Sequence, residues 1–153
     1  MTVDLDDTDR AILVRLVADG SLSAGALSRE IGMSQPAVWR RVKRLEEAGV
    51  IAGRRLDLDL EKAGFGVTVF LGVKLATKGR VSLADFERAI TAIPEVQEVH
   101  HVLGLYDYRL RVVARDLSDF ERVLRRRIMT LPGVGGVEAN VMLSEEVRPG
   151  PIG

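Results

Sequence analysis

Four cationic side chains stand within five consecutive positions, 40–44 (RRVKR), directly after Trp39, the only tryptophan of the chain. The 153 residues include 22 basic and 22 acidic side chains, so this cluster is not part of a general positive surplus. Residues 29–55 contain seven cations against three anions, whereas residues 1–28 contain five Asp against two Arg. A basic patch confined to one segment indicates a site for a polyanion such as DNA.

Three helices are predicted within residues 1–55, and they must position this cluster. Asp6 or Asp7 can cap the first helix, whose apolar stripe consists of Ile12, Leu13, Leu16 and Val17. Ser23 can cap the second helix, and Gly32 supplies its C-terminal stop. Ser34 follows two positions later as the cap of the third helix. A helix, a tight turn with glycine and a second helix form the helix-turn-helix pattern.

The third helix, which ends at Gly49, has an apolar and a polar side when it is placed on a wheel at about 100° per residue. The apolar side must face the core and holds Val38, Val42 and Leu45. The opposite side holds Pro36, Arg40, Lys43 and Arg44, and the two boundaries hold Arg41 and Trp39. An extended segment with two further arginines follows this helix.

The major groove of B-DNA is about 12 Å wide and admits one α-helix, whose first turns reach base edges. The residues placed for base contact are Ser34, Gln35, Pro36, Trp39 and Arg40. The residues suited to phosphates are Arg41, Lys43, Arg44, Arg54 and Arg55. A solvated charged face is the alternative, but charge, turn spacing and caps all favour double-stranded DNA as a partner. One short helix binds DNA weakly, so we also expect a homodimer or a larger homo-oligomer.

The second half of the chain contains an internal repeat. The tetrapeptide DFER occurs at 85–88 and again at 119–122, and each copy is followed by an aliphatic residue, Pro, any residue and Val. Strand patterns precede both copies, at 66–76 and 108–115. The resulting order β-α-β-β-α-β predicts an α+β, ferredoxin-like sandwich with two helices on one face of a sheet. We therefore expect two domains, residues 1–60 and 61–153, with residues 66–75 (GVTVFLGVKL) of the apolar strand as the dimer interface.

The segment 104–107 (GLYD) lies between two predicted strands. Gly and Asp are ordinary turn residues, so a plain hairpin turn accounts for them. The functional alternative makes this turn one wall of a small-molecule pocket, in which Asp107 and backbone amides receive a zwitterion such as an amino acid.

Several classes of protein are disfavoured by composition. The chain has no cysteine, which excludes disulfides and thiolate metal sites. The acidic N-terminus is unlike a signal peptide and no run is long enough to span a membrane, so a cytoplasmic protein with no membrane partner is expected. His100 and His101 are adjacent in a strand and point to opposite faces, so they cannot chelate one metal together. We expect no catalysis, no metal and no cofactor.

Segments 5–13 (LDDTDRAIL), 27–51, 104–112 (GLYDYRLRV) and 131–134 (LPGV) together resemble the Lrp/AsnC, or feast/famine, transcription regulators. The resemblance implies a winged helix-turn-helix followed by a βαββαβ (RAM/ACT-like) domain that dimerises and often assembles dimers into octamers. It also implies an effector, commonly an amino acid, near Gly104, Tyr106 and Asp107, with Leu105 in the variable slot and Asn140 beside the pocket. The sequence departs from the family at Leu105, where many members have a polar residue, and at 135–140 (GGVEAN), where many are Thr/Ser- and Arg-rich.

Two other functions fit the same scaffold. Siroheme decarboxylases are similar to Lrp/AsnC proteins and use histidines in a tetrapyrrole pocket, for which His100 or His101 would be candidates. An architectural protein would compact DNA with little sequence preference. The basic helix favours a sequence-specific regulator over the enzyme.

Overall fold

The computed structural model describes residues 1–76 and 82–152, which form two compact units. The N-terminal unit comprises Met1–Asp57 together with the end of the chain from Glu146, and the C-terminal unit comprises Leu58–Glu145. The end of the chain groups with the first unit because Ile152 packs against its core and accepts a hydrogen bond from Arg10 (3.4 Å). The predicted division of the chain into residues 1–60 and 61–153 stays a prediction.

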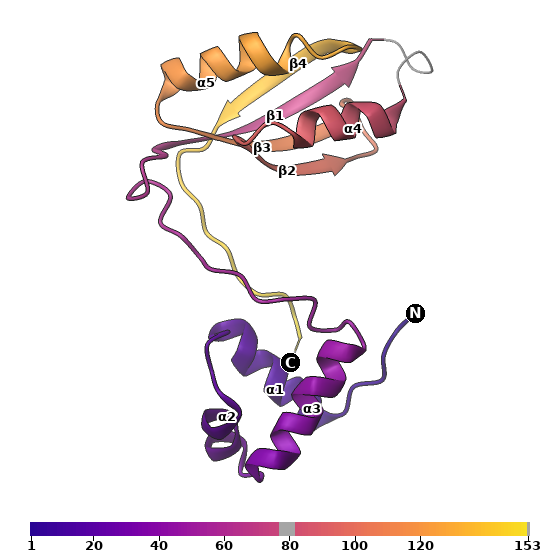
Figure 1. Cartoon of the computed structure of the whole chain (residues 1–153), viewed down its shortest axis with the longest axis vertical. Helices are drawn as coiled ribbons and strands as arrows, with labels where there is room; N and C mark the ends of the chain where they lie inside the picture. Colours follow the sequence, from indigo (N-terminus) through magenta and orange to yellow (C-terminus); the bar gives the residue numbers. More distant parts are fainter. Residues whose placement is uncertain (77–81, 153) are drawn as a thin grey trace. The chain divides into compact units, whose positions relative to one another are not determined.

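Three helices build the N-terminal unit, α1 (Asp7–Ala18), α2 (Ala24–Ile31) and α3 (Gln35–Glu47) (Figure 1). The predicted caps are present: the side chains of Asp6, Ser23 and Ser34 each accept a hydrogen bond from a backbone amide in the first turn. Gly32 ends α2 with φ +77°, a left-handed conformation that favours glycine. The predicted helix-turn-helix is therefore confirmed.

The core of this unit contains Ile12, Leu27, Val38 and Leu45, all essentially inaccessible to solvent. Val17 was predicted to belong to the same stripe, but it is 45% exposed. It lies five positions after Ile12, so it is turned about 140° away around α1 and leaves the buried face. The rest of the predicted stripe is buried.

The C-terminal unit has the predicted βαββαβ order. Its elements are β1 (Val67–Leu75), α4 (Leu83–Thr91), β2 (Val96–His101), β3 (Tyr108–Ala114), α5 (Leu117–Val123), the π-helical turn η1 (Leu124–Ile128) and β4 (Val134–Val141). The strands form one antiparallel sheet in the order β2-β3-β1-β4. The α+β class is confirmed.

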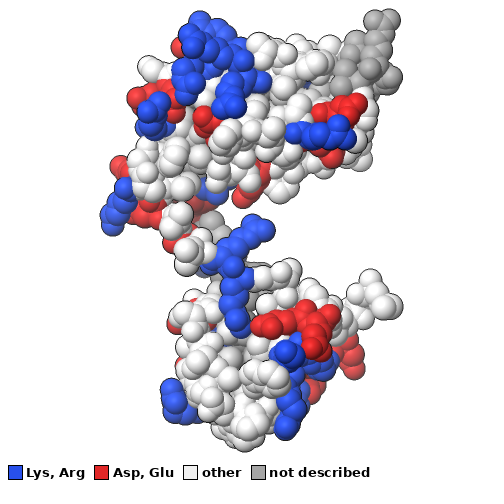
Figure 2. All heavy atoms as spheres, in the orientation of Figure 1, with Lys and Arg blue, Asp and Glu red and all other residues white. Residues whose placement is uncertain are grey.

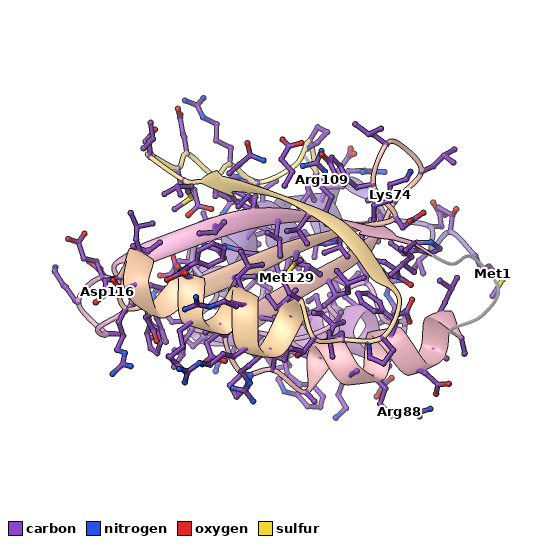
Figure 3. All side chains as sticks on the ribbon, turned by 90° about the horizontal axis from the view of Figure 1, so that it is seen from above. Met1, Lys74, Arg88, Arg109, Asp116 and Met129 are labelled. Carbon is purple, nitrogen blue, oxygen red and sulfur yellow. The ribbon has the colours of Figure 1, made fainter. Side chains whose placement is uncertain are left out.

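The helices α4 and α5 pack on one face of the sheet (Figure 1), and no helix among the described residues covers the other face. Phe86 and Phe120, the aromatic residues of the two DFER copies, are both buried there against β1 and β3. Lys74 and Arg109 project from the opposite side of the strands, away from the helix that carries Arg88 (Figure 3). The alternation of side chains along the strands thus separates an apolar core face from an open polar face.

The second DFER helix is longer than the first because four more residues separate the motif from the following proline. The additional residues include three consecutive arginines, 125–127, and the chain forms the wide turn η1 here. Ile128, at the end of this turn, still reaches the core and is fully buried. A π-helical turn accommodates an insertion while keeping the flanking apolar residues on one face.

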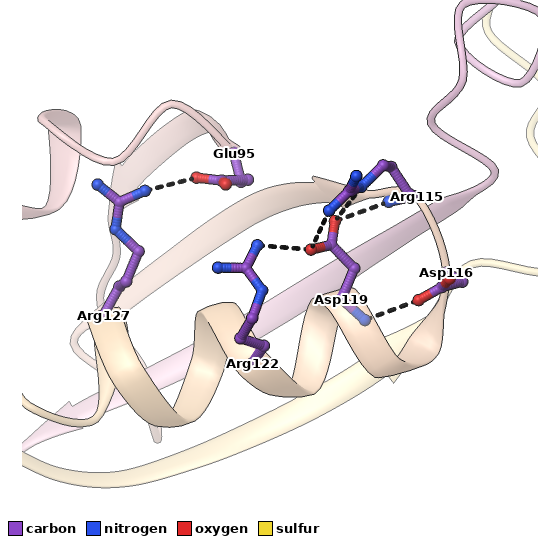
Figure 4. A network of polar contacts seen from close by, with 6 residues as sticks. All are labelled: Glu95, Arg115, Asp116, Asp119, Arg122 and Arg127. Atoms are coloured by element: carbon purple, nitrogen blue, oxygen red, sulfur yellow. Dashed lines mark hydrogen bonds and ion pairs between the residues drawn. The ribbon is translucent and has the colours of Figure 1, made fainter.

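A polar network joins the end of β3 to α5 (Figure 4). The Asp116 carboxylate caps the helix by accepting from the backbone amide of Asp119 (2.7 Å). The buried Asp119 carboxylate accepts hydrogen bonds from Arg122 (2.6 Å) and from the backbone and side chain of Arg115. Arg122, and then Arg115, hold the pKa of Asp119 well below its usual range, and the network fixes the start of α5 against β3.

Candidate nucleic-acid interface

The first turn of α3 is exposed, and its conformation is stabilised by the capping residue Ser34 and by Pro36. Ser34 Oγ accepts from the amide of Ala37 (3.4 Å), and Pro36 lies in the first turn, where a missing amide hydrogen costs little. Gln35 is exposed, and a Cβ added at Gly25 of α2 would lie 3.7 Å from its carboxamide, an ordinary van der Waals distance. The Gln35 side chain therefore lies next to α2 at the N-terminus of α3.

One face of α3 presents unneutralised cations to solvent. Trp39 is 54% exposed, and the ammonium group of Lys43 lies 5.0 Å from the centroid of its ring, so the two side chains form a cation–π pair. Arg40 is exposed beside them. Neither Arg40 nor Lys43 forms an ion pair with any residue in the described parts of the chain. This outer face, which we define as Trp39, Arg40 and Lys43, combines positive charge with an aromatic surface.

The other two cations of α3 are engaged by α1. Arg41 donates to Asp6 (2.7 Å) and to Asp9 (3.1 Å), and Arg44 donates to Asp9. Arg41 lowers the pKa of Asp6, and Asp6 followed by Asp9 raises the pKa of Arg41. Figure 2 shows basic and acidic side chains lying against one another on the N-terminal unit. The sequence predicted Asp6 or Asp7 as a cap, but it did not reveal that Asp6 and Asp9 both bind α3.

The segment that follows α3 carries one paired and one unpaired arginine. Arg54 lies 3.4 Å from Glu46 of α3, whereas Arg55 is exposed and has no ion-pair partner among the described residues. Residues 50–58 form no strand. A groove lined by α1 and this segment also contains Ile152 from the end of the chain.

The turn between β2 and β3 is hydrogen-bonded to the C-terminal end of β1. The carbonyl of Asp107 accepts from the amide of Val102 (3.0 Å), and the amide of Asp107 donates to the carbonyl of Val73 (2.9 Å). The Asp107 carboxylate accepts from the amide of Leu75 (2.8 Å), at the point where the register between β1 and β4 shifts. Asp107 therefore has a structural function in this chain. Gly104 is exposed at the tip of the turn.

Tyr106 extends from this turn over the open face of the sheet. Its ring covers Gly72, where a Cβ would come within 2.9 Å of the ring, and its hydroxyl donates to Glu138 on β4. Asn140 donates to the same carboxylate (3.2 Å). The bond with Glu138 raises the pKa of Tyr106, and Tyr106 followed by Asn140 lowers the pKa of Glu138. The structure thus brings two predicted effector residues, Tyr106 and Asn140, to one carboxylate.

Two cations adjoin the same turn. The ammonium group of Lys74 donates to the carbonyl of Leu105 (3.0 Å), and the guanidinium of Arg109 lies 5.6 Å from the centroid of the Tyr106 ring. The side chain of Leu105 itself is exposed. Lys74, Arg109 and Glu138 were not predicted as site residues, although their alternate positions along the strands place them on the open face.

The two histidines are engaged separately. His100 lies 3.2 Å from Glu98, and the ring of His101 stacks on that of Tyr108 with 4.8 Å between centroids. No group of three or more potential metal ligands occurs in residues 1–76 and 82–152. Within the same ranges, no helix is long and apolar enough to cross a membrane.

A helix-turn-helix with a cationic outer face, joined to a separate βαββαβ unit, defines a DNA-binding regulator with a second functional domain. Residues 5–52 match the family model of winged helix-turn-helix DNA-binding domains, and residues 68–152 match that of the Lrp/AsnC ligand-binding domain. The chain belongs to the Lrp/AsnC family of transcriptional regulators, and the predicted resemblance is confirmed.

Known relatives align over nearly the whole chain. The transcriptional regulator AzlB of Bacillus subtilis is 35% identical over 97% of this chain and 94% of its own length. The Bkd operon transcriptional regulator of Pseudomonas aeruginosa is 37% identical, over 89% of both chains. The crystal structure of a transcriptional regulator from Neisseria meningitidis in complex with L-Met superposes with a TM-score of 0.89, at 28% identity over 95% of this chain and 94% of that one.

Proposed function

We propose that this transcriptional regulator reads its operator with the outer face of α3 and the first turn of that helix. The observation that carries this proposal is that Trp39, Arg40 and Lys43 are exposed together on a helix whose other polar side is neutralised. Arginine binds guanine edges bidentately and glutamine binds adenine edges, so Arg40 and Gln35 are the base-reading residues. Ser34 and Pro36 shape the turn that brings them to the groove.

The phosphate contacts come from Lys43 and Arg55, which have no ion-pair partner among the described residues. Arg54 contributes less because Glu46 compensates its charge (3.4 Å). Phosphate contacts set the position and affinity of a protein on DNA, whereas base contacts set its sequence preference. Substitutions at the two kinds of residue should therefore have different effects.

Selection of binding sequences from a random pool of duplexes tests this function. The wild-type protein should enrich one sequence with two related half-sites, and Arg40→Gln or Trp39→Ala should broaden the enriched set. Failure of the wild type to enrich any sequence would contradict a sequence-specific reader. Footprinting on a long duplex then separates the two DNA-binding alternatives, because a regulator protects discrete sites and an architectural protein protects DNA uniformly.

We further propose an amino-acid effector site at the turn 104–107, on the open face of the sheet. Glu138 would receive the ammonium group and Lys74 or Arg109 the carboxylate, since all three adjoin the turn through Tyr106 or Leu105. The exposed Leu105 favours an apolar side chain on the ligand. The L-Met complex of the Neisseria meningitidis regulator supports an effector of this chemistry.

Thermal-shift screening of the twenty amino acids on the purified protein tests the effector site. One or a few amino acids should raise the melting temperature of the wild type, and Glu138→Gln should abolish that shift. A ligand-induced shift that survives in Glu138→Gln would place the site elsewhere. A flat response to all twenty would contradict an amino-acid effector.

We also propose that the chain works in the cytoplasm as a homodimer, or as a larger assembly of dimers, through the open face of the sheet. Phe70 on β1 is 37% exposed on this face. A second copy of the chain would cover this aromatic side chain and remove it from water. Sedimentation of wild type and Phe70→Asp tests this surface, since the variant should dissociate to monomers.

A further inference from the structure

Asp9 is the one charged residue with a buried side chain in the described part of the N-terminal unit, with 1% of its surface exposed. It lies in the first turn of α1, so it belongs to a different helix from the proposed DNA-reading residues. A carboxylate withdrawn from water requires hydrogen-bonding or charged partners. The identity of those partners indicates what Asp9 does.

Among the described residues, the partners of the Asp9 carboxylate lie at the start of α1 or on α3. Its carboxylate accepts from the backbone amide of Asp6 (3.2 Å), from Arg41 (3.1 Å) and from Arg44. Asp6 in turn accepts from the amide of Asp9 (2.8 Å) and from Arg41 (2.7 Å). Asp6 and Asp9 thus cap each other at the N-terminus of α1, and the guanidinium groups of Arg41 and Arg44 join this N-terminus to one side of α3.

We infer that Asp9 is a positioning residue for sequence recognition, acting through Arg41 and Arg44; this inference rests on the proposed reading of DNA by α3. The two arginines lie three positions apart, so together they fix both the rotation of α3 about its axis and its tilt. Two of the four cations in the segment 40–44 thus orient the helix, and the other two, Arg40 and Lys43, face the partner.

The dimensions of the helix show why orientation matters. Arg44 and Gln35 are nine residues apart, about 13 Å along the helix axis. A tilt of about 10° at Arg44 would therefore displace Gln35 by about 2 Å, whereas base hydrogen bonds need donor–acceptor distances of about 2.7–3.2 Å. Phosphate contacts by long flexible side chains tolerate such a displacement better. Loss of the contacts between Asp9 and the two arginines should therefore reduce specific binding to DNA more than non-specific binding.

Asp9→Asn distinguishes positioning from simple electrostatics. Removal of a negative charge near a DNA-binding helix should by itself strengthen binding to any duplex. Positioning predicts instead that affinity for the selected duplex falls while affinity for a shuffled duplex stays equal or rises. The ratio of the two should fall by about 5- to 150-fold, the loss of one good base contact. Asp7→Asn is the matched control, because Asp7 is exposed in the same turn of α1.

Fluorescence anisotropy with both duplexes measures these ratios, and circular dichroism confirms that each variant is folded. Arg44→Gln provides an independent test that also applies if Asp9→Asn does not fold. Positioning predicts that Arg44→Gln lowers the specific-to-shuffled ratio without changing the salt dependence of binding to the shuffled duplex. A phosphate contact predicts equal losses on both duplexes and a weaker salt dependence.

Two results would overturn the inference: Asp9→Asn behaving like Asp7→Asn, with an unchanged ratio, or Arg44→Gln weakening both duplexes equally. Either result would leave DNA reading by α3 intact. If the wild-type protein itself did not discriminate between the two duplexes, the proposed function would fail.

Discussion

The salt dependence of DNA binding follows from which cations are already neutralised within the protein. Six cations lie on α3 and the segment after it, and three of them, Arg41, Arg44 and Arg54, are paired with carboxylates. Each phosphate neutralised on B-DNA contributes about 0.9 to the slope of log affinity against log salt concentration. A dimer that contacts phosphates with Lys43 and Arg55 of each protomer should therefore show a slope of about 4, whereas phosphate contacts by all six cations of each protomer would give about 11.

Arg54 and Arg55 form a matched pair for testing this account, because they are neighbours of the same type and only Arg54 has a carboxylate partner. Arg55→Gln should lower the slope by about 2 for a dimer. The loss of affinity between 50 and 200 mM salt should then be about 12-fold smaller for the variant than for the wild type. Arg54→Gln should change the slope by less than half as much. Anisotropy titrations of one duplex over this salt range provide the slopes.

Equal decreases for the two variants would refute the reasoning, because the ion pair with Glu46 would then have no influence on counterion release. A wild-type slope near 11 would contradict it in the same way. An unchanged slope in Arg55→Gln would show that the segment after α3 does not reach the DNA backbone.

Two further predictions concern the C-terminal unit. Gly135→Ala should destabilise the protein by about 1–3 kcal/mol, since the new Cβ would lie 2.7 Å from Cβ of Ala76, whereas Gly136→Ala, which meets nothing within 4 Å, should stay within about 0.5 kcal/mol of wild type. Equal urea midpoints for the two variants would count against this packing. Burial, and then the hydrogen bond to Glu87 (2.7 Å), raise the pKa of Tyr108 to about 12, above its value of about 10 in the unfolded chain. The stabilisation from this tyrosine is therefore fully present below about pH 10 and is lost as pH rises towards 12. Urea unfolding of wild type and Tyr108→Phe at pH 8, 10 and 11.5 should show a difference that shrinks with pH, and a constant difference would be inconsistent with the shifted pKa.

Most of the fold could be predicted because its signals are local. The caps at Asp6, Ser23 and Ser34 and the left-handed Gly32 depend on residues within four positions of one another. The βαββαβ order followed from the DFER repeat together with the strands before it. The wide turn at 124–128 was not anticipated, since it reflects how an insertion is absorbed against the core.

The candidate site was predicted less completely because it depends on contacts between elements distant in sequence. A wheel shows which side of α3 is polar, but it does not show that α1 places Asp9 within reach of Arg41 and Arg44, about 35 residues away. The phosphate contacts assigned to these two arginines stay a prediction, and the ion pairs favour a different role. Asp107 likewise binds the amide of Leu75 at an irregularity of the sheet that no local pattern indicates.

The accessibility of Trp39 gives the most direct measurement of whether α3 enters DNA. It is the only tryptophan in the chain and is 54% exposed, so its fluorescence reports on the outer face without any labelling. If α3 lies in the groove, a saturating amount of the selected duplex should protect Trp39 from quenching by acrylamide, and a shuffled duplex at the same concentration should protect it less. Equal quenching of the free and the DNA-saturated protein would contradict the proposal that this helix reads the operator.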